Sequence, residues 1–419
     1  MISLIKAKAV LGLGLSNLAR VLTYQFGIKT GLNKVKSIKS EIKQGDFFTP
    51  YIGSIINSQC NTQWFDKHAY FGLEKVSTAI PNWHQSCLNG ELAPSDKPWY
   101  LIGDFNNQLG DIKGVWEASR FDWVVGFAQQ VVSGDKDTLI KLNLWVTDWI
   151  KNNPTYNGVN WKCGQEASIR VMHLALAALL LKQTKNTTPA LLSLIKAHLK
   201  RISPTIMYAV AQDNNHGTSE AAALYIGGSW LVLNGDNDGV KWQKQGLKWL
   251  ENRANKLIET DGSFSQYSVN YHRVMLDTYS LTEMWRQKHN LPSFTERLYT
   301  KLKAATNWLF YFTNPDTGDA PNLGANDGAR LIPLTDTDYR DFRPSIQLAS
   351  TLFINKAAFE FSGEFNSPLK WLELKIPEQY VASKAPKDFT DGGYAYLTSL
   401  SSELYFNYPK FKFRPSQND

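Results

Sequence analysis

Apolar side chains recur at steps of three or four residues through most of the chain. In one such stretch, Val171, Leu174, Ala178 and Leu181 fall on one face of a helix. Polar breaks rich in Gly, Pro and Asn separate stretches of this kind, so consecutive helices should pack as antiparallel hairpins. The predicted helices are approximately Trp116–Val132, Asp135–Lys151, Gln165–Leu181, Pro189–Gln212, Thr218–Val232, Val240–Glu259, Asn270–Lys288 and Phe294–Phe312.

The loops between these hairpins recur at a regular spacing. Polar or aromatic segments begin at Trp116, Glu166, His216, Tyr271 and Asn322, at intervals of 50 to 55 residues. Each interval holds one helix going out and one coming back, so antiparallel packing returns these segments to one end of the helices. We therefore expect a mostly α protein, an α/α toroid of helical hairpins with one functional rim. A helical solenoid without such a rim is the alternative.

Strand-like alternation is expected only near the end of the chain. Short alternating runs at Tyr394–Thr398 and Glu403–Asn407 predict the first strands of an antiparallel sheet domain, which is incomplete at Asp419. Three regions follow: residues 1–95 as an N-terminal helical arm and irregular segment, residues 96–385 as the toroid, and residues 386–419 as the start of the sheet domain.

Charge and cysteine content narrow the choice of partners. The chain of 419 residues has a formal net charge of +7, which favours an anionic partner. We find no nucleic-acid-binding motif, and an acidic polysaccharide accounts for the charge equally well. The three cysteines have no metal-ligand spacing, and we predict neither a metal nor a cofactor.

The N-terminal segment partly resembles a signal peptide, which is relevant to the cellular location of the protein. Residues 1–19 carry Lys6 and Lys8 ahead of a short apolar run, as signal peptides do, but Asn17 interrupts the cleavage pattern. An ordinary helix is therefore the favoured interpretation of this segment. No segment is as long and apolar as a membrane span. We expect a periplasmic or cell-envelope protein, with a cytoplasmic location as the alternative.

Two predicted helix starts carry candidate chemistry. Asn215 and His216 lie where a polar loop enters an alanine-rich helix, and unpaired backbone N–H groups there attract a carboxylate. Hydrogen bonds from these groups would neutralise the carboxylate of a uronate, so that its C5 proton can leave. Removal of this proton is the chemistry of a polysaccharide lyase. The structural alternative is that Asn215 only caps the helix.

The second helix start carries Tyr271, His272 and Arg273. Tyr271 could take the C5 proton or give one to the departing O4, and its structural alternative is a buried core tyrosine. A phenol ordinarily titrates near ~10, so a neighbouring cation is expected, and His272 and Arg273 are the candidates.

Several segments together resemble the heparinase II/III-like lyases, especially relatives associated with bacterial envelope polysaccharides. The matching segments are DIKGVWEASRFDW (111–123), WKCGQEASIRV (161–171), NNHGTSEAAAL (214–224), DGSFSQYSVNYHR (261–273), NLGANDGARL (322–331) and FRPSQND (413–419). The resemblance implies an α/α toroid followed by a β-sandwich domain, and cleavage of uronic-acid polysaccharides by β-elimination. It also implies a partner histidine just beyond the last matching segment, where this chain has ended.

The resemblance assigns roles to individual residues. Asn215 and His216 would neutralise the carboxylate, and Tyr271 would be the catalytic acid/base. Further substrate-binding candidates at the rim are Arg273, His272, Glu166, Trp116 and Arg120. For Glu166, a surface pair with Arg170 four residues on is the structural alternative.

Two other functions remain open from the sequence. A glycoside hydrolase on the same fold would need two carboxylates across the scissile bond, and Glu166, Asp261 and Asp327 all lie on predicted rim loops. A non-catalytic glycan-binding or biosynthesis-associated protein is the other alternative. Elimination leaves a conjugated double bond that absorbs ultraviolet light, whereas hydrolysis and binding leave none.

Overall fold

The computed structural model describes residues 14–65, 67–70, 74–77, 79–103, 105–106, 108–399, 402–408, 410 and 412. The chain divides into two compact units, each drawing on separate segments. Unit 1 contains the chain up to Arg20, Val210–Thr218 and everything from Lys248 onward, and unit 2 contains Val21–Ala209 and Ser219–Leu247. No helix in the described part of the chain has the length and apolar character needed to cross a membrane.

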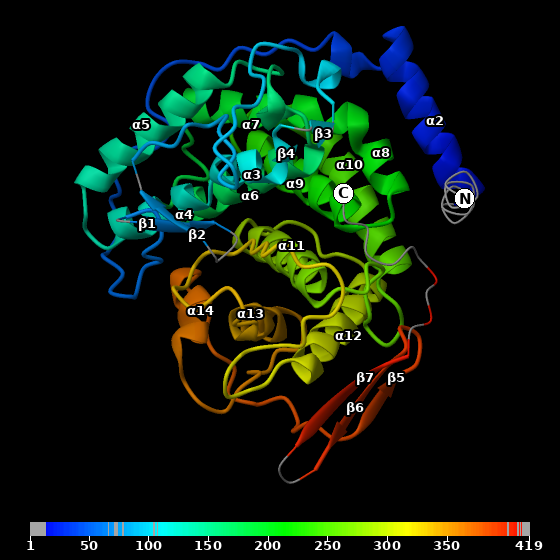
Figure 1. Ribbon diagram of the computed structural model, residues 1–419. Helices are drawn as coiled ribbons and strands as arrows, with labels where there is room; N and C mark the ends of the chain where they lie inside the picture. The colour runs from blue at the N-terminus through cyan, green and yellow to red at the C-terminus, as the bar shows by residue number, and fades with distance from the viewer. Residues whose placement is uncertain are drawn as a thin grey trace. The chain divides into compact units, whose positions relative to one another are not determined.

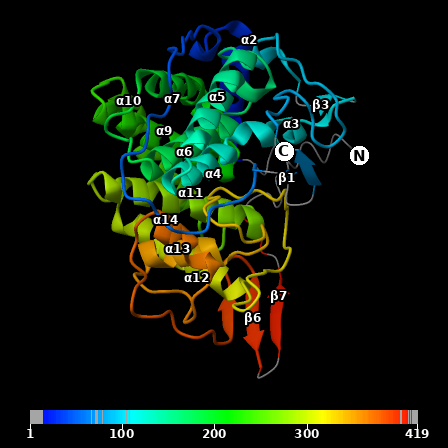
Figure 2. The ribbon, with the colours of Figure 1, turned by 90° about the vertical axis from the view of Figure 1, so that its left-hand side faces the viewer.

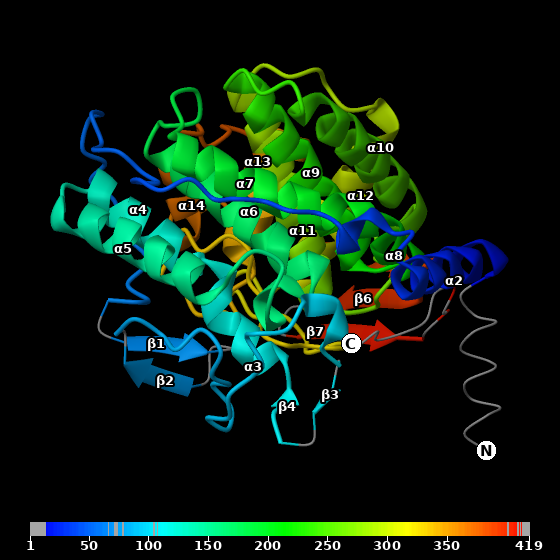
Figure 3. The same cartoon turned by 90° about the horizontal axis from the view of Figure 1, so that it is seen from above.

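Four helices form the core of unit 2 (Figures 2 and 3). They are α4 (Asp122–Val132), α5 (Asp137–Asn152), α6 (Gly164–Leu180) and α7 (Pro189–Ile202). Helix α4 packs against α5 and α6, and α6 packs against α7. Nearly every residue of α6 is buried, so it is enclosed by its neighbours on all sides. This arrangement matches the hairpins that the apolar spacing predicts.

Two predicted helices are divided in the structure. The stretch Trp116–Val132 is broken at Phe121, whose φ of 68° is left-handed and cannot continue a helix. The stretch Pro189–Gln212 is broken around Pro204, which has no N–H for the helical ladder. The resulting pieces are α3 (Lys113–Trp116), η3 (Glu117–Arg120), η5 (Ser203–Thr205) and α8 (Ile206–Ala211).

Glycines bring two helices into close contact in unit 2. These are α9 (Asn215–Leu233) and α10 (Gly239–Leu257). A Cβ on Gly228 would lie 2.4 Å from a backbone nitrogen of α10, and one on Gly246 would lie 2.3 Å from a backbone nitrogen of α9. The two backbones can approach this closely because neither position carries a side chain.

The expectation of no strands before the C-terminal region is wrong. Two short antiparallel hairpins precede α4 in the chain, each too short to produce a period-two pattern that stands out in the sequence. His68 on the first strand is buried and stacks on Trp64, with ring centroids 3.7 Å apart. The strands are β1 (Lys67–Tyr70), β2 (Glu74–Ser77), β3 (Phe105–Asn106) and β4 (Gly110–Asp111).

Unit 1 is built around three helices that contact one another (Figure 1). They are α11 (Val269–Lys288), α12 (Glu296–Phe312) and α13 (Arg343–Phe353), followed by the short α14 (Ser367–Trp371). The first 17 residues of α11, from Val269 to Trp285, are all buried. Helix α13 was not predicted, although Pro344 in its first turn is a recognised start signal.

A three-stranded antiparallel sheet follows the helices of unit 1, in the order β5–β6–β7. The strands are β5 (Lys387–Phe389), β6 (Tyr394–Thr398) and β7 (Glu403–Asn407), and the last two coincide with the predicted runs. Tyr394 and Tyr396 are buried and pack against aromatic residues of α12. The predicted class, helical hairpins of a mostly α chain followed by strands of an antiparallel sheet, is confirmed.

The remaining elements are short or peripheral. Helix α2 lies near the N-terminus, where the sequence favoured an ordinary helix, and residues 1–13 of that segment lie outside the described residues. The elements are α2 (Leu15–Thr30), η1 (Lys34–Lys36), η2 (Trp99–Leu101), η4 (Val159–Trp161) and η6 (Glu364–Asn366).

Candidate active site

At the start of α9, the side-chain amide of Asn215 has no hydrogen-bond partner among the residues that the structure describes. The Asn214 side chain takes the capping role, because its Oδ1 accepts the backbone N–H of His216 at 3.0 Å. Asn215 is 3% exposed, and among the described residues none hydrogen bonds to its side-chain amide. Capping therefore does not explain Asn215, and its amide is available to a ligand beside the positive end of α9.

The turn that leads into α9 is fixed by charge. Asp213 has a left-handed φ of 53°. Its carboxylate accepts hydrogen bonds from Arg253 at 2.8 Å and from Lys256 at 2.7 Å. The amide of Asn17 donates to the same carboxylate at 2.6 Å. These bonds, all within unit 1, hold the backbone from which Asn215 projects.

One short segment links the start of α9 to the start of α11. The Gln266 side chain accepts the backbone N–H of Asn215 at 2.9 Å, and the Ser265 hydroxyl donates to the carbonyl of Asp213 at 2.9 Å. Two residues later, Ser268 caps α11 by accepting the N–H of Tyr271 at 3.1 Å. The amide of Asn215 and the phenol of Tyr271 therefore belong to one hydrogen-bonded constellation in unit 1.

The group that the structure places at the Tyr271 hydroxyl is a carboxylate. Tyr271 is 7% exposed, and its hydroxyl donates to Asp327 Oδ2 at 3.1 Å. The other oxygen of Asp327 accepts from the amide of Asn270 at 3.1 Å and from the N–H of Ala329 at 3.1 Å. Bonds to both oxygens orient the carboxylate toward the phenol. The sequence placed Asp327 on a predicted rim loop, and a cation was expected beside Tyr271.

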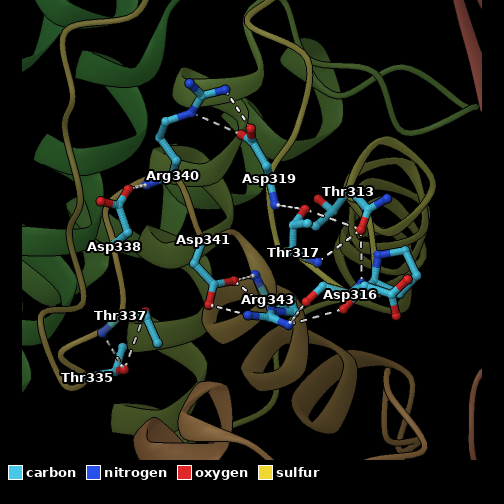
Figure 4. A network of polar contacts seen from close by, with 12 residues as sticks. Thr313, Asp316, Thr317, Asp319, Thr335, Thr337, Asp338, Arg340, Asp341 and Arg343 are labelled. Atoms are coloured by element: carbon cyan, nitrogen blue, oxygen red, sulfur yellow. Dashed lines mark hydrogen bonds and ion pairs between the residues drawn. The ribbon is translucent and has the colours of Figure 1, made fainter.

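The loop that carries Asp327 is fastened at both its tip and its base. At the tip, Ser268 donates to the carbonyl of Ala325 at 2.5 Å, and a Cβ on Gly324 would lie 2.4 Å from a backbone oxygen. At the base, Arg340 binds Asp319 through two hydrogen bonds of 3.0 and 2.6 Å (Figure 4). Asp327 is therefore held by the loop's own anchors as well as by its contact with Tyr271.

His272 and Arg273 are packed inside unit 1. His272 stacks on Trp308, and its Nε2 lies 2.9 Å from the carbonyl oxygen of Ala305. Burial lowers the pKa of His272 to about 4, so the ring is neutral at neutral pH. The Arg273 guanidinium donates to Asn270 at 2.9 Å and to backbone carbonyls of the loop, and burial lowers its pKa to about 10. These contacts hold α11 and the loop together, so we leave both side chains out of the proposed substrate contacts.

Three predicted rim residues belong to unit 2. Arg120 forms a bidentate pair with Glu166, with bonds of 2.9 and 3.1 Å, and also binds Glu117 at 2.8 Å. The indole N–H of Trp116 donates to the carbonyl of Val159 at 2.9 Å, inside an apolar cluster. A surface pair between Glu166 and Arg170 is not formed, because both side chains are buried and Arg170 donates to His198 at 2.9 Å.

The candidate carboxylates of a hydrolase are all acceptors of hydrogen bonds. Asp261 accepts from the N–H and hydroxyl of Ser263 at 2.9 and 2.7 Å, and from two backbone N–H groups of the β5–β6 turn. Glu166 is bound to Arg120 through both oxygens, and Asp327 accepts from three donors. Hydrolysis needs one carboxyl group that carries a proton. All three carboxylates are engaged in hydrogen bonds within the chain.

Two further features bear on ligands. Within the described ranges, no group of three or more His, Cys, Asp or Glu side chains is placed to hold a metal ion.

Asn322 lines a surface hollow of about 670 Å³, together with Asp316, Asp319, Arg340, Glu403 and Tyr405. Three carboxylates against one guanidinium make this lining acidic, so the hollow does not suit an acidic polysaccharide.

The sequence profile of the heparinase II/III N-terminus family matches residues 65–337, and this chain belongs to that family. The chain is 26% identical over 240 residues to a heparin-sulfate lyase of Bacteroides thetaiotaomicron, a match that covers 55% of this chain and 31% of the relative. The chain thus matches about a third of that relative's length.

Two solved structures are similar to parts of this chain. A crystal structure of heparinase III has a TM-score of 0.48 at 16% identity, covering 93% of this chain and 57% of that one. A heparan sulfate lyase from Pedobacter heparinus has a TM-score of 0.46 at 16% identity, covering 92% of this chain and 57% of that one.

The structure also identifies supporting residues that the sequence did not single out. Gln266 and Ser268 lie in the segment SFSQYS and link the two helix starts, and Asp213 anchors the turn before Asn215. A polar run directly before a helix start was the available signal, but nothing in it says which partner each side chain meets. The segment at 413–419, which carried part of the resemblance, lies outside the described residues.

Proposed function

We propose that this chain carries the site of a polysaccharide lyase that cleaves a uronic-acid-containing acidic polysaccharide by β-elimination. The observation that carries the proposal is the linkage of the two helix starts, with the unoccupied amide of Asn215 at one and the phenol of Tyr271 at the other. Membership of the heparinase II/III family and the net charge of +7 support the same substrate class.

The chemistry follows from what each group can offer. The C5 proton of a uronate is weakly acidic because the adjacent carboxylate is already negative. Hydrogen bonds from Asn215 and His216, beside the positive end of α9, would neutralise that carboxylate and stabilise the enolate-like transition state. Tyr271 would exchange protons with C5 and with the departing O4.

The relative matched by sequence is named as a heparin-sulfate lyase, so a sulfated uronic-acid polysaccharide is the first substrate to test. The purified chain is incubated with heparan sulfate, hyaluronan, alginate and polygalacturonate, and the ultraviolet absorbance of the unsaturated product is followed. We expect eliminative cleavage of at least one of them. New reducing ends without ultraviolet absorbance would indicate hydrolysis instead. Binding without any product, unaffected by Tyr271→Phe, would indicate a non-catalytic glycan-binding protein.

A further inference from the structure

The single hydroxyl proton of Tyr271 is already committed to an acceptor. It is donated to Asp327 Oδ2 at 3.1 Å, and Asp327 also accepts from Asn270 and from the N–H of Ala329. Both oxygens of Asp327 therefore act as hydrogen-bond acceptors. The bond to Asp327 uses the hydroxyl proton of Tyr271 and not the lone pairs of its oxygen.

A carboxylate beside a phenol opposes ionisation of the phenol. The chain shows this effect at a second tyrosine, because burial together with a hydrogen bond to Glu403 raises the pKa of Tyr396 to about 12. A phenol with its ordinary pKa is neutral at neutral pH, and the contact with Asp327 does not favour its ionisation. A neutral phenol cannot accept the C5 proton unless its own proton leaves at the same time.

Asp327 is the acceptor that the geometry places at the Tyr271 hydroxyl, and several charged groups lie around the pair. Arg273 on α11 interacts electrostatically with Asp327 and donates to Asn270, which in turn donates to Asp327. Asp277 on α11, and Arg330 and Tyr339 on the loop, also interact electrostatically with Arg273. His272, the other titratable group beside Tyr271 in the sequence, is neutral and lies against the carbonyl of Ala305.

We propose that Tyr271 and Asp327 form a proton relay, in which Asp327 is the positioning residue that lets a neutral Tyr271 act as the base. This proposal rests on the proposed lyase function. As the C5–H bond breaks, its proton passes to the Tyr271 oxygen, and the original hydroxyl proton passes to Asp327. The electron pair of the C5–H bond is delocalised into the neutralised carboxylate of the substrate.

The second half of the reaction restores the pair. The delocalised electron pair forms the double bond between C4 and C5, and the C4–O4 bond breaks. O4 takes the proton of Tyr271, and Asp327 returns its proton to Tyr271. One product carries a new hydroxyl group, the other carries the double bond, and the enzyme regains its starting protonation state without another co-reactant.

Asp327→Asn tests the relay by its pH profile. The variant cannot receive the proton, so at neutral pH kcat should fall by about 10²-fold or more. Its remaining activity should rise with pH, because only the phenolate can then act as base. Asp327→Glu keeps a carboxylate and should recover part of the neutral-pH activity. Asp316→Asn, which removes an exposed carboxylate of the same unit, should behave like wild type. Wild-type kcat at neutral pH in Asp327→Asn overturns the relay.

A second measurement does not depend on activity. In protein labelled with ¹³C at the tyrosine ζ carbon, the Tyr271 signal is assigned by its loss in Tyr271→Phe and then titrated. Asp327→Asn should lower the pH at which Tyr271 ionises by about one unit or more. An unchanged titration of Tyr271 overturns the relay whatever the activity. If the wild-type chain releases no unsaturated product from any polysaccharide, the relay fails together with the lyase assignment, even where the titration shows that the two groups interact.

Discussion

Gln266 holds the first residue of a helix that starts 51 positions earlier in the chain: its side-chain oxygen accepts the backbone N–H of Asn215 at 2.9 Å. The bond ties the segment that enters α11 to the start of α9, and both lie in unit 1. The distance between Asn215, which would bind the carboxylate, and Tyr271, which would transfer the proton, therefore depends in part on this amide.

Gln266→Ala should lower kcat more than it lowers stability. Loss of one buried hydrogen bond costs about 1 kcal/mol, whereas displacement of Asn215 relative to Tyr271 should reduce kcat about tenfold or more. The measurements are kcat and the urea midpoint of unfolding. Gln44→Ala, at an exposed glutamine of unit 2, is the control and should change neither. An unaltered kcat in Gln266→Ala would show that the linkage does not position the site.

Neighbouring asparagines offer a matched comparison of capping and catalysis. Asn214 caps α9, so Asn214→Ala should cost about 1 kcal/mol of stability. Among the described residues nothing hydrogen bonds to the Asn215 amide, so Asn215→Ala should leave stability within about 0.5 kcal/mol while kcat falls, because stabilisation of the transition state is lost. Unfolding and steady-state kinetics are measured on both variants. The reverse pattern would assign the cap to Asn215 and remove it from the site.

Tyr271→Phe removes the hydroxyl and keeps the ring. Proton transfer to and from the sugar is lost, so kcat should fall by about 10²-fold or more with little change in KM. Tyr380→Phe, at a half-exposed tyrosine of the same unit, is the control for loss of a phenol and should retain full activity. Turnover near that of wild type in Tyr271→Phe would exclude Tyr271 as the acid/base.

His272 should make the protein sensitive to mild acid. Burial lowers its pKa from 6.5 to about 4. Between these two values the unfolded chain binds a proton that the folded chain excludes, so stability is lost as the pH falls from about 6.5 to about 4. The contribution is at most about 3 kcal/mol.

His272→Phe keeps a ring against Trp308 and removes the titration, so its stability should depend less on pH in this window than that of wild type. Urea unfolding at pH 7.5 and at pH 5 measures the difference. His198 and His68 are also buried with lowered pKa values, so wild-type stability should still fall with acid in the variant. An identical pH dependence in the two proteins would mean that His272 does not titrate in this range.

Hydrogen exchange should distinguish the strands of the C-terminal sheet. Strand β6 pairs on both sides, and Tyr394 and Tyr396 bury it against α12, so its amides should be protected. Strand β7 pairs only with β6 among the described strands, and Leu404 and Phe406 are 55% and 54% exposed. Its outward amides should exchange quickly. Fast exchange throughout β6 would show that the sheet does not persist in solution.

Local patterns predicted the elements of this chain better than they predicted its contacts. The three- and four-residue spacing places α5, α6, α11 and α12 to within a few residues, and alternation places β6 and β7, because each pattern reflects one buried face of one element. The break at Phe121 could not be foreseen in this way. A left-handed φ at a large aromatic residue is set by packing rather than by local preference.

In the candidate site, too, the positions of the residues could be predicted from the sequence but their contacts could not. Asn215, His216 and Tyr271 stand at helix starts in the sequence and in the structure, because capping and polar runs are local signals. The partner of Tyr271 lies 56 positions away on an irregular loop, and a carboxylate there is indistinguishable in sequence from a turn residue. Similarly, Glu166 was paired with a residue four positions on, whereas the tertiary fold brings it to Arg120, 46 positions earlier.

The ion pair between Asp319 and Arg340 joins two positions 21 residues apart at the base of the Asp327 loop. A backbone bond of 2.8 Å from Phe342 to Gly318 lies beside it, so the intervening segment leaves and re-enters the helical framework at nearly one place. Exposed positions of a loop closed in this way can change without altering the helices, because its ends stay fixed and closure entropy grows only slowly with length. Side chains at these positions could therefore vary within the family, while the contacts of Ser268 and Arg273 keep the loop on α11.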